Sequence, residues 1–229
     1  MSPLWTMIFT ALGGVLAGFA LTAALLYRQM NLLDAARRQI ATQQRRAADA
    51  EQLARRDDTT GLPNRRAFLE HLDQALAADT GVGVVMLDLD DFKTVNDTFG
   101  HQTGNDLLTA VGLRLADLHP PVALAARLSG DEFVLLVTGD AEQTRACARA
   151  AWRAITRTPI PIAERTDWRI NASVGYTTDG ATPHDLLRHA DAAMYQAKQA
   201  GGGVCERTAA TEAWPQPPRH GRCRDAHRR

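Results

Sequence analysis

The chain has few cysteines and no excess of either charge. Its 229 residues include three cysteines, Cys147, Cys205 and Cys223, which have neither metal-ligand spacing nor an obvious disulfide pairing. This pattern fits a reducing compartment. Lysine plus arginine number 26, as do aspartate plus glutamate. The net charge therefore argues neither for nor against a nucleic-acid partner, and we expect none.

Charged residues are also absent from Pro3 to Tyr27. A run of this length can cross a hydrocarbon core of about 30 Å as one helix. Because arginines follow only on its C-terminal side, the positive-inside rule places everything after Arg28 in the cytoplasm. A cleaved secretory signal is the alternative, but it needs a basic n-region, which Met1-Ser2-Pro3 lacks. We therefore expect residues 1–27 to be a single transmembrane anchor.

Proline and glycine are both absent from Arg28 to Arg56, where alanine, glutamine and arginine dominate. Apolar and small residues recur there every seven positions, at Leu26, Leu33, Ile40, Ala47 and Ala54. This stripe predicts a helical stalk over residues 28–56 that pairs in parallel with a second copy as a coiled coil. A single solvated linker helix is the alternative, because several residues of the stripe are small.

After Asp57 the pattern changes to short helices and strands. Two of the expected strands form a hairpin, and helices separate the others. The expected elements are helix 65–78, strand 82–89, a helical turn, helix 105–118, strands 123–128 and 133–138, helix 142–156, strand 168–176 and helix 185–200. Helices interleaved with a hairpin predict an α/β fold with a mixed sheet. We expect residues 208–229, rich in proline, arginine and histidine, to be a disordered basic tail.

Acidic side chains gather where two of the expected strands end. One group ends the apolar run of the first strand, and the other follows the Ser129-Gly130 turn of the hairpin. These residues are Asp88, Asp90, Asp91, Asp131 and Glu132. A carboxylate at a strand end is costly to desolvate unless a cation lies nearby. Each acid alone would be interpreted as a solvated turn residue, but the set predicts an oxygen-ligand site suited to Mg²⁺.

Five segments follow one another between residues 57 and 203: DDTTGLPNRR, LDLDDFKTVNDTFGHQTG, RLSGDEFVLL, NASVGY and ADAAMYQAK. Together they resemble the GGDEF family of diguanylate cyclases, with SGDEF as a variant of the signature. The resemblance implies a nucleotide-cyclase-like mixed central sheet flanked by helices, over residues 57–207. It also implies an enzyme that condenses two GTP into cyclic di-GMP and two pyrophosphates. With the expected anchor, this enzyme would lie in the bacterial inner membrane. Mg²⁺, or Mn²⁺ in its place, would be the cofactor, and cyclic di-GMP receptors would act downstream.

The resemblance also assigns roles to individual residues. The metal ligands would be Asp88, the carbonyl of Leu89, and Asp131. Asp131 would also take the proton of the attacking 3′-hydroxyl, beside the negative charge of Glu132, while Lys93 would offset charge in the transition state. The remaining residues would contact the nucleotide; they are Asp91, Phe92, Asn96, His101, Asn105, Gly130 and Lys198.

These assignments agree with the chemistry of the reaction. In-line attack of an alcohol on a phosphate needs a cation, a local base and a lysine to spread charge. Two nucleotides must also meet face to face, so two domains must associate antiparallel. A paired stalk would raise their effective concentration towards the millimolar range without new contacts. The sequence therefore predicts a homodimer.

Asn105 stands where the family usually has the aspartate that reads guanine. An amide offers one acceptor and one donor, so one guanine donor would meet another donor. An unmet buried polar group costs about 1–3 kcal/mol. We therefore predict a weaker preference for guanine, with some acceptance of ATP.

Other departures bear on activity. Gly202 replaces an arginine, which predicts weaker triphosphate binding. Pro120 and Ala123 replace the arginine and aspartate of the inhibitory product site, which predicts no product inhibition there. The leading hypothesis is an active cyclase. The alternatives are a catalytically weak module that binds nucleotide or a protein partner, and a membrane-tethered scaffold.

Overall fold

The structure is a computed structural model that describes residues 3–78, 80–161 and 168–207. The chain divides into two compact units, Met1–Ala54 and Arg55–Arg229. Each unit has its own architecture and is described by itself. The tail predicted over 208–229 lies outside the described residues.

The first unit consists of one long helix, α1 (Pro3–Leu53). The stalk sequence contains no helix breaker, so the helix continues through it without interruption. Leu26, Leu33 and Ile40 of the heptad stripe are all more than half exposed in the single chain. No helix among the described residues is both long and apolar enough to span a bilayer. The anchor expected over residues 1–27 is therefore not supported, and the coiled coil stays a prediction.

A five-stranded mixed sheet forms the centre of the second unit, in the order β2-β3-β1-β4-β5. β1 (Val82–Leu89) pairs antiparallel with both β3 (Glu132–Thr138) and β4 (Ala172–Thr177). β2 (Val122–Ser129) pairs antiparallel with β3, and β5 (Gly203–Glu206) pairs parallel with β4. The predicted mixed sheet is confirmed.

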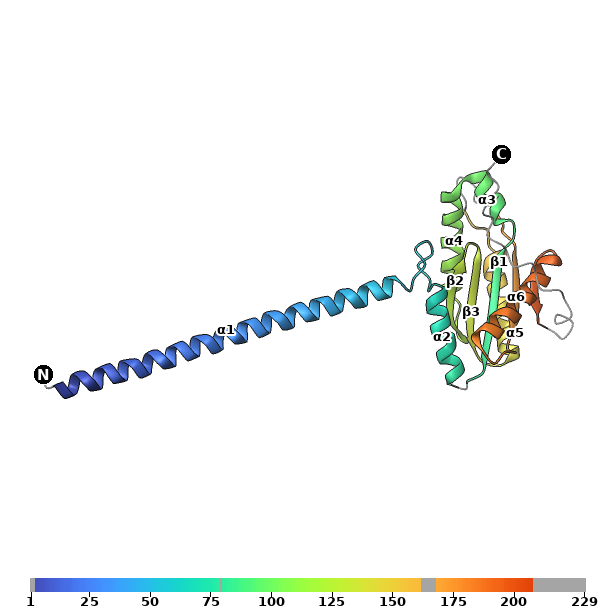
Figure 1. The fold of residues 1–229 in the computed structure, drawn as a ribbon. Helices are drawn as coiled ribbons and strands as arrows, with labels where there is room; N and C mark the ends of the chain where they lie inside the picture. Colours follow the sequence, from blue (N-terminus) through green and yellow to red (C-terminus); the bar gives the residue numbers. More distant parts are fainter. Residues whose placement is uncertain (1–2, 79, 162–167, 208–229) are drawn as a thin grey trace, which may run out of the picture. The chain divides into compact units, whose positions relative to one another are not determined.

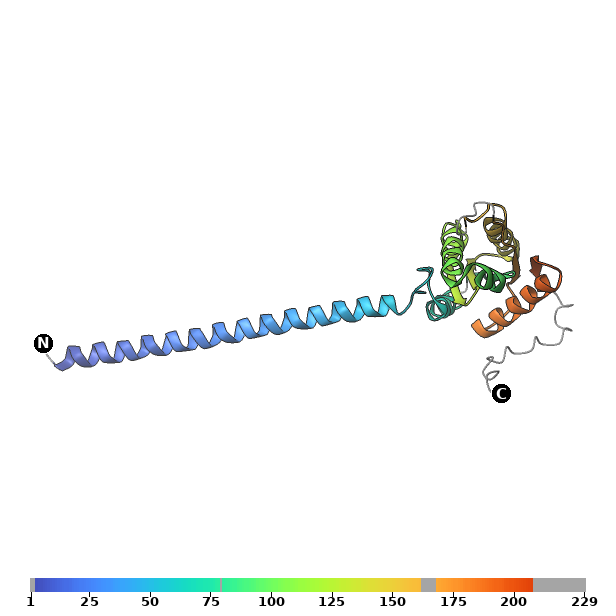
Figure 2. The ribbon, with the colours of Figure 1, turned by 90° about the horizontal axis from the view of Figure 1, so that it is seen from above.

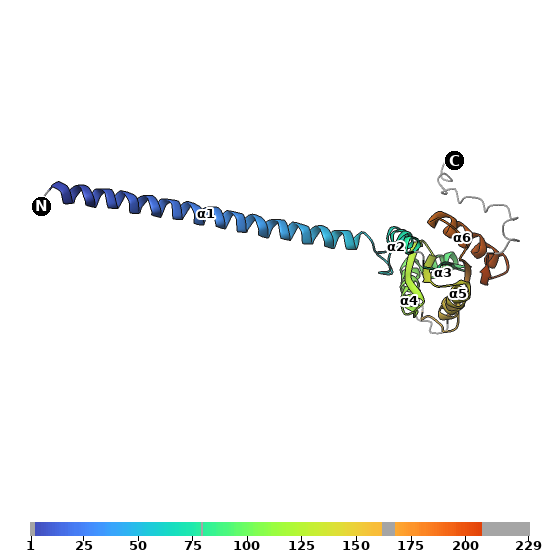
Figure 3. The same ribbon diagram turned by 90° about the horizontal axis from the view of Figure 1, so that it is seen from below.

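Helices cover both faces of this sheet. α2 (Arg65–Ala77) and α6 (Pro183–Gln199) lie on one face, and α4 (His101–Ala116) and α5 (Ala141–Thr156) lie on the other (Figure 2, Figure 3). The short helix α3 (Phe92–Phe99) follows β1 at the end where that strand stops (Figure 1). The predicted architecture of helices flanking a mixed sheet is therefore confirmed.

The alternation of β1 explains how its acidic end is placed. Val84 and Met86 pack into the core under α2 and α6, whereas Leu87 and Leu89 pack into the core under α4 and α5. Successive strand residues point to opposite faces, so Asp88 belongs to the α2 and α6 face. Both faces are covered, which is why the strand is an almost continuous apolar run.

Three local predictions differ from the structure. The strand expected from residue 168 begins only at Ala172, because Trp168 instead packs edge-to-face on Phe99 and its carbonyl accepts from the Ile160 N–H. The helix expected from residue 105 begins at His101, directly after the positive-φ Gly100. β5 was not expected, since its first residue is a glycine and its pairing partner lies far away in the sequence.

Candidate active site

The end of β1 and the signature hairpin meet at one edge of the sheet. Asp88 is the register partner of Glu132 across the β1–β3 ladder. The Leu89 N–H donates to the Asp131 carbonyl at 3.4 Å, which joins the end of β1 to the turn itself. The two groups of acids that the sequence singled out are therefore brought together.

A lysine from α6 reaches this edge. Lys198 Nζ donates to Asp88 Oδ1 at 2.6 Å, forming an ion pair. The Asp88 side chain is 11% exposed and that of Lys198 is 48% exposed. The lysine lies in the last turn of α6, where a cation also interacts favourably with the helix dipole. Asp88 is thus a mostly buried carboxylate held by a partly solvated ammonium.

The site carries more negative charge than Lys198 neutralises. Burial raises the pKa of Asp88, with the Asp131 charge adding to the rise and Lys198 opposing it. Burial also raises the pKa of Asp131, again against the attraction of Lys198. Burial lowers the pKa of Lys198, but the bond to Asp88 and the charges of Asp131 and Asp90 outweigh it, so the net shift is upward. A poorly solvated excess of carboxylate favours binding of a further cation.

The donor set suits a divalent cation that also binds phosphates. No group of three or more His, Cys, Asp or Glu side chains in the described part of the chain is arranged as a metal site. Mg²⁺ does not need one, because it is usually held by one or two carboxylates together with substrate phosphates. Asp88 and Asp131, with the Leu89 carbonyl, are the residues that would hold it. Their oxygen donors and the excess of carboxylate at the end of β1 suit this ion. The metal roles stay predictions.

The turn after β1 leaves a helix N-terminus uncapped. Asp91 adopts left-handed backbone angles, φ 58° and ψ 21°, and its side chain makes no cap hydrogen bond to α3. The first N–H groups of α3 are therefore available to an anion at the end of β1. Phe92, the first residue of α3, is partly buried against the core and anchors this turn. The phosphate-binding role of Asp91 and Phe92 stays a prediction.

Lys93 forms an ion pair within its own helix, and its predicted role in the transition state stays a prediction. Its ammonium donates to Asp97 Oδ2 at 2.7 Å, one helical turn along α3, and its side chain is 85% exposed. An ion pair this exposed is weak, so the lysine is free to exchange partners. The structure does not bring it to the Asp88 carboxylate, where Lys198 lies instead.

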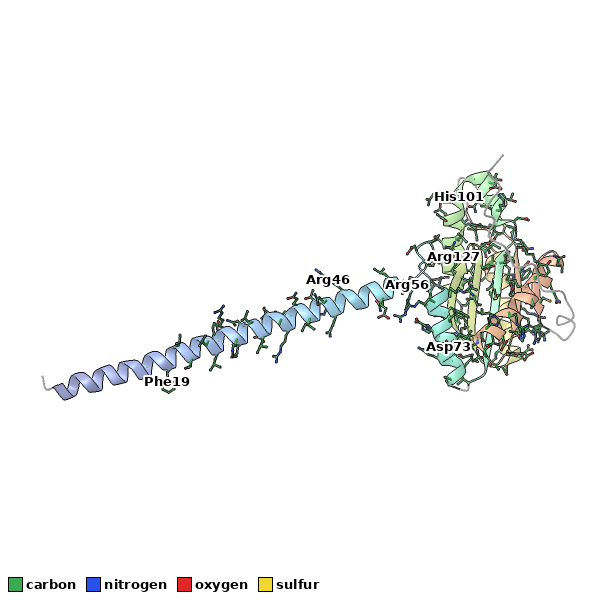
Figure 4. All side chains as sticks on the ribbon, in the orientation of Figure 1. Phe19, Arg46, Arg56, Asp73, His101 and Arg127 are labelled. Carbon is green, nitrogen blue, oxygen red and sulfur yellow. The ribbon has the colours of Figure 1, made fainter. Side chains whose placement is uncertain are left out.

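Three of the predicted nucleotide-contacting residues, Asn96, His101 and Asn105, lie on α3 and α4. A Cβ at Gly104 would lie 1.9 Å from Asn96 Oδ1, so only glycine allows the Asn96 side chain to lie against α4. Asn105 is the next residue of α4 and is exposed, as is His101 in the first turn of that helix (Figure 4). Close packing of α3 on α4 thus seats the Asn96 amide against Gly104, while the Asn105 side chain stays exposed on α4.

The hairpin turn is held by an arginine that sequence reasoning did not single out. Arg127 Nε and Nη2 donate to the Gly130 carbonyl at 2.9 and 2.6 Å, and Nη1 donates to Asp57 Oδ1 at 2.8 Å. The same Asp57 oxygen accepts from the Thr60 N–H and hydroxyl. These bonds outweigh burial and lower the pKa of Asp57. Asp57 begins the motif DDTTGLPNRR and Arg127 begins the motif RLSGDEFVLL. Their place in these motifs was the only sign in the sequence that they could have a role. Gly130 has φ 50°, as its turn requires.

The structure leaves no room for a side chain at Gly202, where the family usually has an arginine. Gly202 has φ 100°, and a Cβ there would lie 2.1 Å from Asn171 Nδ2 and 2.8 Å from Asp90 Oδ2. Asp90 Oδ1 accepts from the Ser173 hydroxyl at 2.7 Å. Its Oδ2 is buried and has no hydrogen-bond partner among the described residues. The Asn171 amide therefore occupies the space that a side chain at residue 202 would need.

A surface groove lies beside α2 and is separate from the acids. It is lined by Arg65, Arg66 and Asp73 of α2 together with Arg127 and Leu128 of β2. Figure 4 shows Arg127 near the start of α2 and Asp73 farther along that helix. None of Asp88, Asp131 and Lys198 lines it. The convergence of carboxylates, lysine and helix N-terminus is a stronger indication of chemistry than a groove, so we place the candidate site at the end of β1.

A family model for the diguanylate cyclase GGDEF domain matches residues 54–203, well over half of the chain. The chain belongs to the GGDEF family. Its fold is also that of solved GGDEF domains. The coiled coil and GGDEF domain of DgcB from Caulobacter crescentus, solved in complex with c-di-GMP, superposes with a TM-score of 0.68. The two are 26% identical, and the match covers 76% of this chain and 96% of that one.

Curated GGDEF relatives differ in their named activities. The bifunctional diguanylate cyclase/cyclic di-GMP phosphodiesterase MucR of Pseudomonas aeruginosa is 41% identical over 163 residues, which cover 67% of this chain and 24% of MucR. The cyclic di-GMP phosphodiesterase PdeR of Escherichia coli is 38% identical over 169 residues, which cover 71% and 25%. This chain therefore spans about a quarter of the length of these relatives.

Proposed function

We propose that this GGDEF protein is a diguanylate cyclase that condenses two GTP into cyclic di-GMP and two pyrophosphates. The observation that carries the proposal is the pairing of buried Asp88 with Lys198, beside Asp131, at the end of β1. A structural ion pair alone would not account for a second, partly buried carboxylate with a raised pKa. Raised carboxyl pKa values in a site that also presents a free helix N-terminus are typical of functional positions.

Each residue of the candidate site has a defined task in this reaction. The N–H groups at the start of α3 bind the triphosphate, and Lys198, at the end of α6, offers it an ammonium. Asp131, whose raised pKa makes it a stronger base than a solvated aspartate, takes the proton of the 3′-hydroxyl. A divalent cation, when bound, supplies charge neutralisation at the phosphate oxygens. Lys93 joins after leaving Asp97, an exchange that costs little because the pair is exposed.

Two domains are required for the complete reaction, because each supplies one nucleotide. We propose a homodimer in which two GGDEF domains meet antiparallel. The exposed stripe of Leu26, Leu33 and Ile40 on α1 supports a parallel pairing of stalks that would keep the domains close together.

A second candidate is a cyclase with relaxed purine specificity. It is favoured by Asn105, whose amide is exposed on α4 and stands where the family usually has an aspartate. An amide presents both a donor group and an acceptor oxygen, whereas a carboxylate presents acceptors only. Adenine, with one donor and one acceptor on its edge, is closer to complementary to an amide than guanine is.

The test is incubation of the full-length protein with Mg²⁺ and GTP, with ATP, and with both nucleotides together. Chromatography with mass detection identifies each dinucleotide formed. Cyclic di-GMP from GTP alone is the expected product, and Asp131→Asn is expected to make none. Asn105→Asp should shift the product ratio towards guanine. Absence of any dinucleotide from the wild-type protein would instead favour a module that binds nucleotide or a protein partner.

A further inference from the structure

Cross-strand pairing places a hydroxyl beside the second acid of the signature turn. Ser129 of β2 and Asp88 of β1 are the register partners of Glu132 on its two sides. Directly opposed residues present their side chains on the same face of a sheet. The Glu132 carboxylate therefore lies in a row between the Ser129 hydroxyl and the Asp88 carboxylate.

The Ser129 hydroxyl contacts this glutamate directly. Ser129 Oγ donates to Glu132 Oε2 at 3.0 Å. Across residues 3–78, 80–161 and 168–207, Glu132 has no lysine or arginine within ion-pair distance, whereas Asp88 has Lys198. A glutamate side chain loses up to about 2 kcal/mol of rotamer entropy when it is fixed. The serine hydroxyl therefore supplies the contact that limits the orientation of Glu132.

The backbone that carries the Ser129 hydroxyl is restrained by hydrogen bonds. The carbonyl of Gly130, the next residue, accepts two hydrogen bonds from the Arg127 guanidinium, whose remaining arm is bound to Asp57. The backbone of the turn is therefore restrained by the Arg127 guanidinium. Serine adds only one side-chain rotation to this support, so its hydroxyl is a well-defined donor. Positioning groups work best when their own geometry is fixed in this way.

We propose that Ser129 is a positioning residue that holds the Glu132 carboxylate where it assists cation binding at Asp88 and Asp131. The inference rests on the proposed cyclase function, since the cation site is part of it. A glycine at this position, as in the usual signature, would carry no hydroxyl. Ser129 therefore gives this chain a contact to Glu132 that the usual signature does not contain.

Mn²⁺ binding to the full-length protein, followed by loss of the free-ion electron paramagnetic resonance signal, tests this role without nucleotide or turnover. Ser129→Ala and Ser129→Gly are each expected to bind Mn²⁺ about three- to tenfold more weakly, as for one lost hydrogen bond, while Ser129→Thr stays within about twofold. In Mg²⁺ titrations of turnover, the alanine variant should need more Mg²⁺ for half-saturation. Its KM for GTP at saturating Mg²⁺ should be unchanged.

Glu132→Ala provides the background control. Adding Ser129→Ala to it should change Mn²⁺ affinity no further, because the acceptor has gone. Three results would overturn the proposal: unchanged Mn²⁺ affinity in Ser129→Ala, an equal loss in the Glu132→Ala background, or no Mn²⁺ binding by the wild-type protein at millimolar concentration. A lower melting temperature with unchanged Mn²⁺ affinity would show a purely structural serine. Failure to make cyclic di-GMP with Mn²⁺ binding intact would count against the proposed function alone.

Discussion

Replacing Lys198 by methionine removes the cation from a mostly buried carboxylate while keeping the aliphatic length of the side chain. At 2.6 Å and an effective dielectric constant of about 20, the attraction between Lys198 and Asp88 is about 6 kcal/mol before desolvation is subtracted. The Asp88 side chain is 11% exposed and that of Lys198 is 48% exposed, so screening and desolvation remove much of this. We expect a net loss of about 1–3 kcal/mol, between the values for surface and buried pairs.

Urea unfolding of the full-length protein near neutral pH, with a chelator present, measures this loss. A decrease of about 0.5–1.5 M in the midpoint is expected for a slope of about 2 kcal/mol per M. Mg²⁺ should stabilise Lys198→Met more than the wild-type protein, because the ion and the ammonium bind the same carboxylate. Lys198→Arg, which keeps the charge, should lose less.

Lys93→Met is the matched control. Its pair with Asp97 has nearly the same length, 2.7 Å, but its side chains are 85% and 60% exposed. The expected loss is therefore below about 0.5 kcal/mol. Equal losses in the two methionine variants, or no loss at Lys198, would refute the reasoning that burial of Asp88 gives this pair its strength.

Three further predictions concern stability. Because the pKa values of Asp88 and Asp131 are raised in the folded protein, these two carboxyls contribute stability to the metal-free fold that is lost as pH rises from about the ordinary aspartate pKa of 3.8. The lowered pKa values of Asp57, Glu70 and Asp185 act in the opposite direction, so the difference between variant and wild type is the quantity to measure. Over this range Asp131→Asn should lose less stability than the wild-type protein in urea titrations, and an identical pH profile would contradict this. Arg114 donates to four backbone carbonyls at and beyond the end of α5. Arg114→Met should therefore lower the free energy of unfolding by about 2–4 kcal/mol, which calorimetry can measure. A loss no larger than the roughly 0.5 kcal/mol typical of an exposed residue would contradict this. A Cβ at Gly175 would lie 2.0 Å from the Met194 backbone nitrogen. Gly175→Ala should therefore push α6 away from β4, lower the free energy of unfolding by more than about 3 kcal/mol and weaken Mn²⁺ binding. An unchanged melting temperature would exclude this clash.

Local patterns in the sequence were sufficient for much of the fold. The apolar run of β1 and the Ser129-Gly130 turn predicted a strand and a hairpin, because side-chain alternation and turn chemistry depend on neighbouring residues. The acids at the end of β1 and those after the turn were identified for the same reason. β5 could not be predicted, since its four residues form a strand only by pairing with β4.

The contacts that make the candidate site depend on the tertiary structure. Lys198 and Asp88 are 110 residues apart in the sequence, and Arg127 and Asp57 are 70 apart. Only the packing of α6 on the sheet selects Lys198 as the partner of Asp88, while Lys93 pairs within its own helix. The sequence by itself thus determined which chemical groups the protein has and on which elements they lie. The packing of distant segments decided which of these groups meet. Burial and charge act between side chains that are close in space, and the spacing of residues along the chain does not determine that closeness.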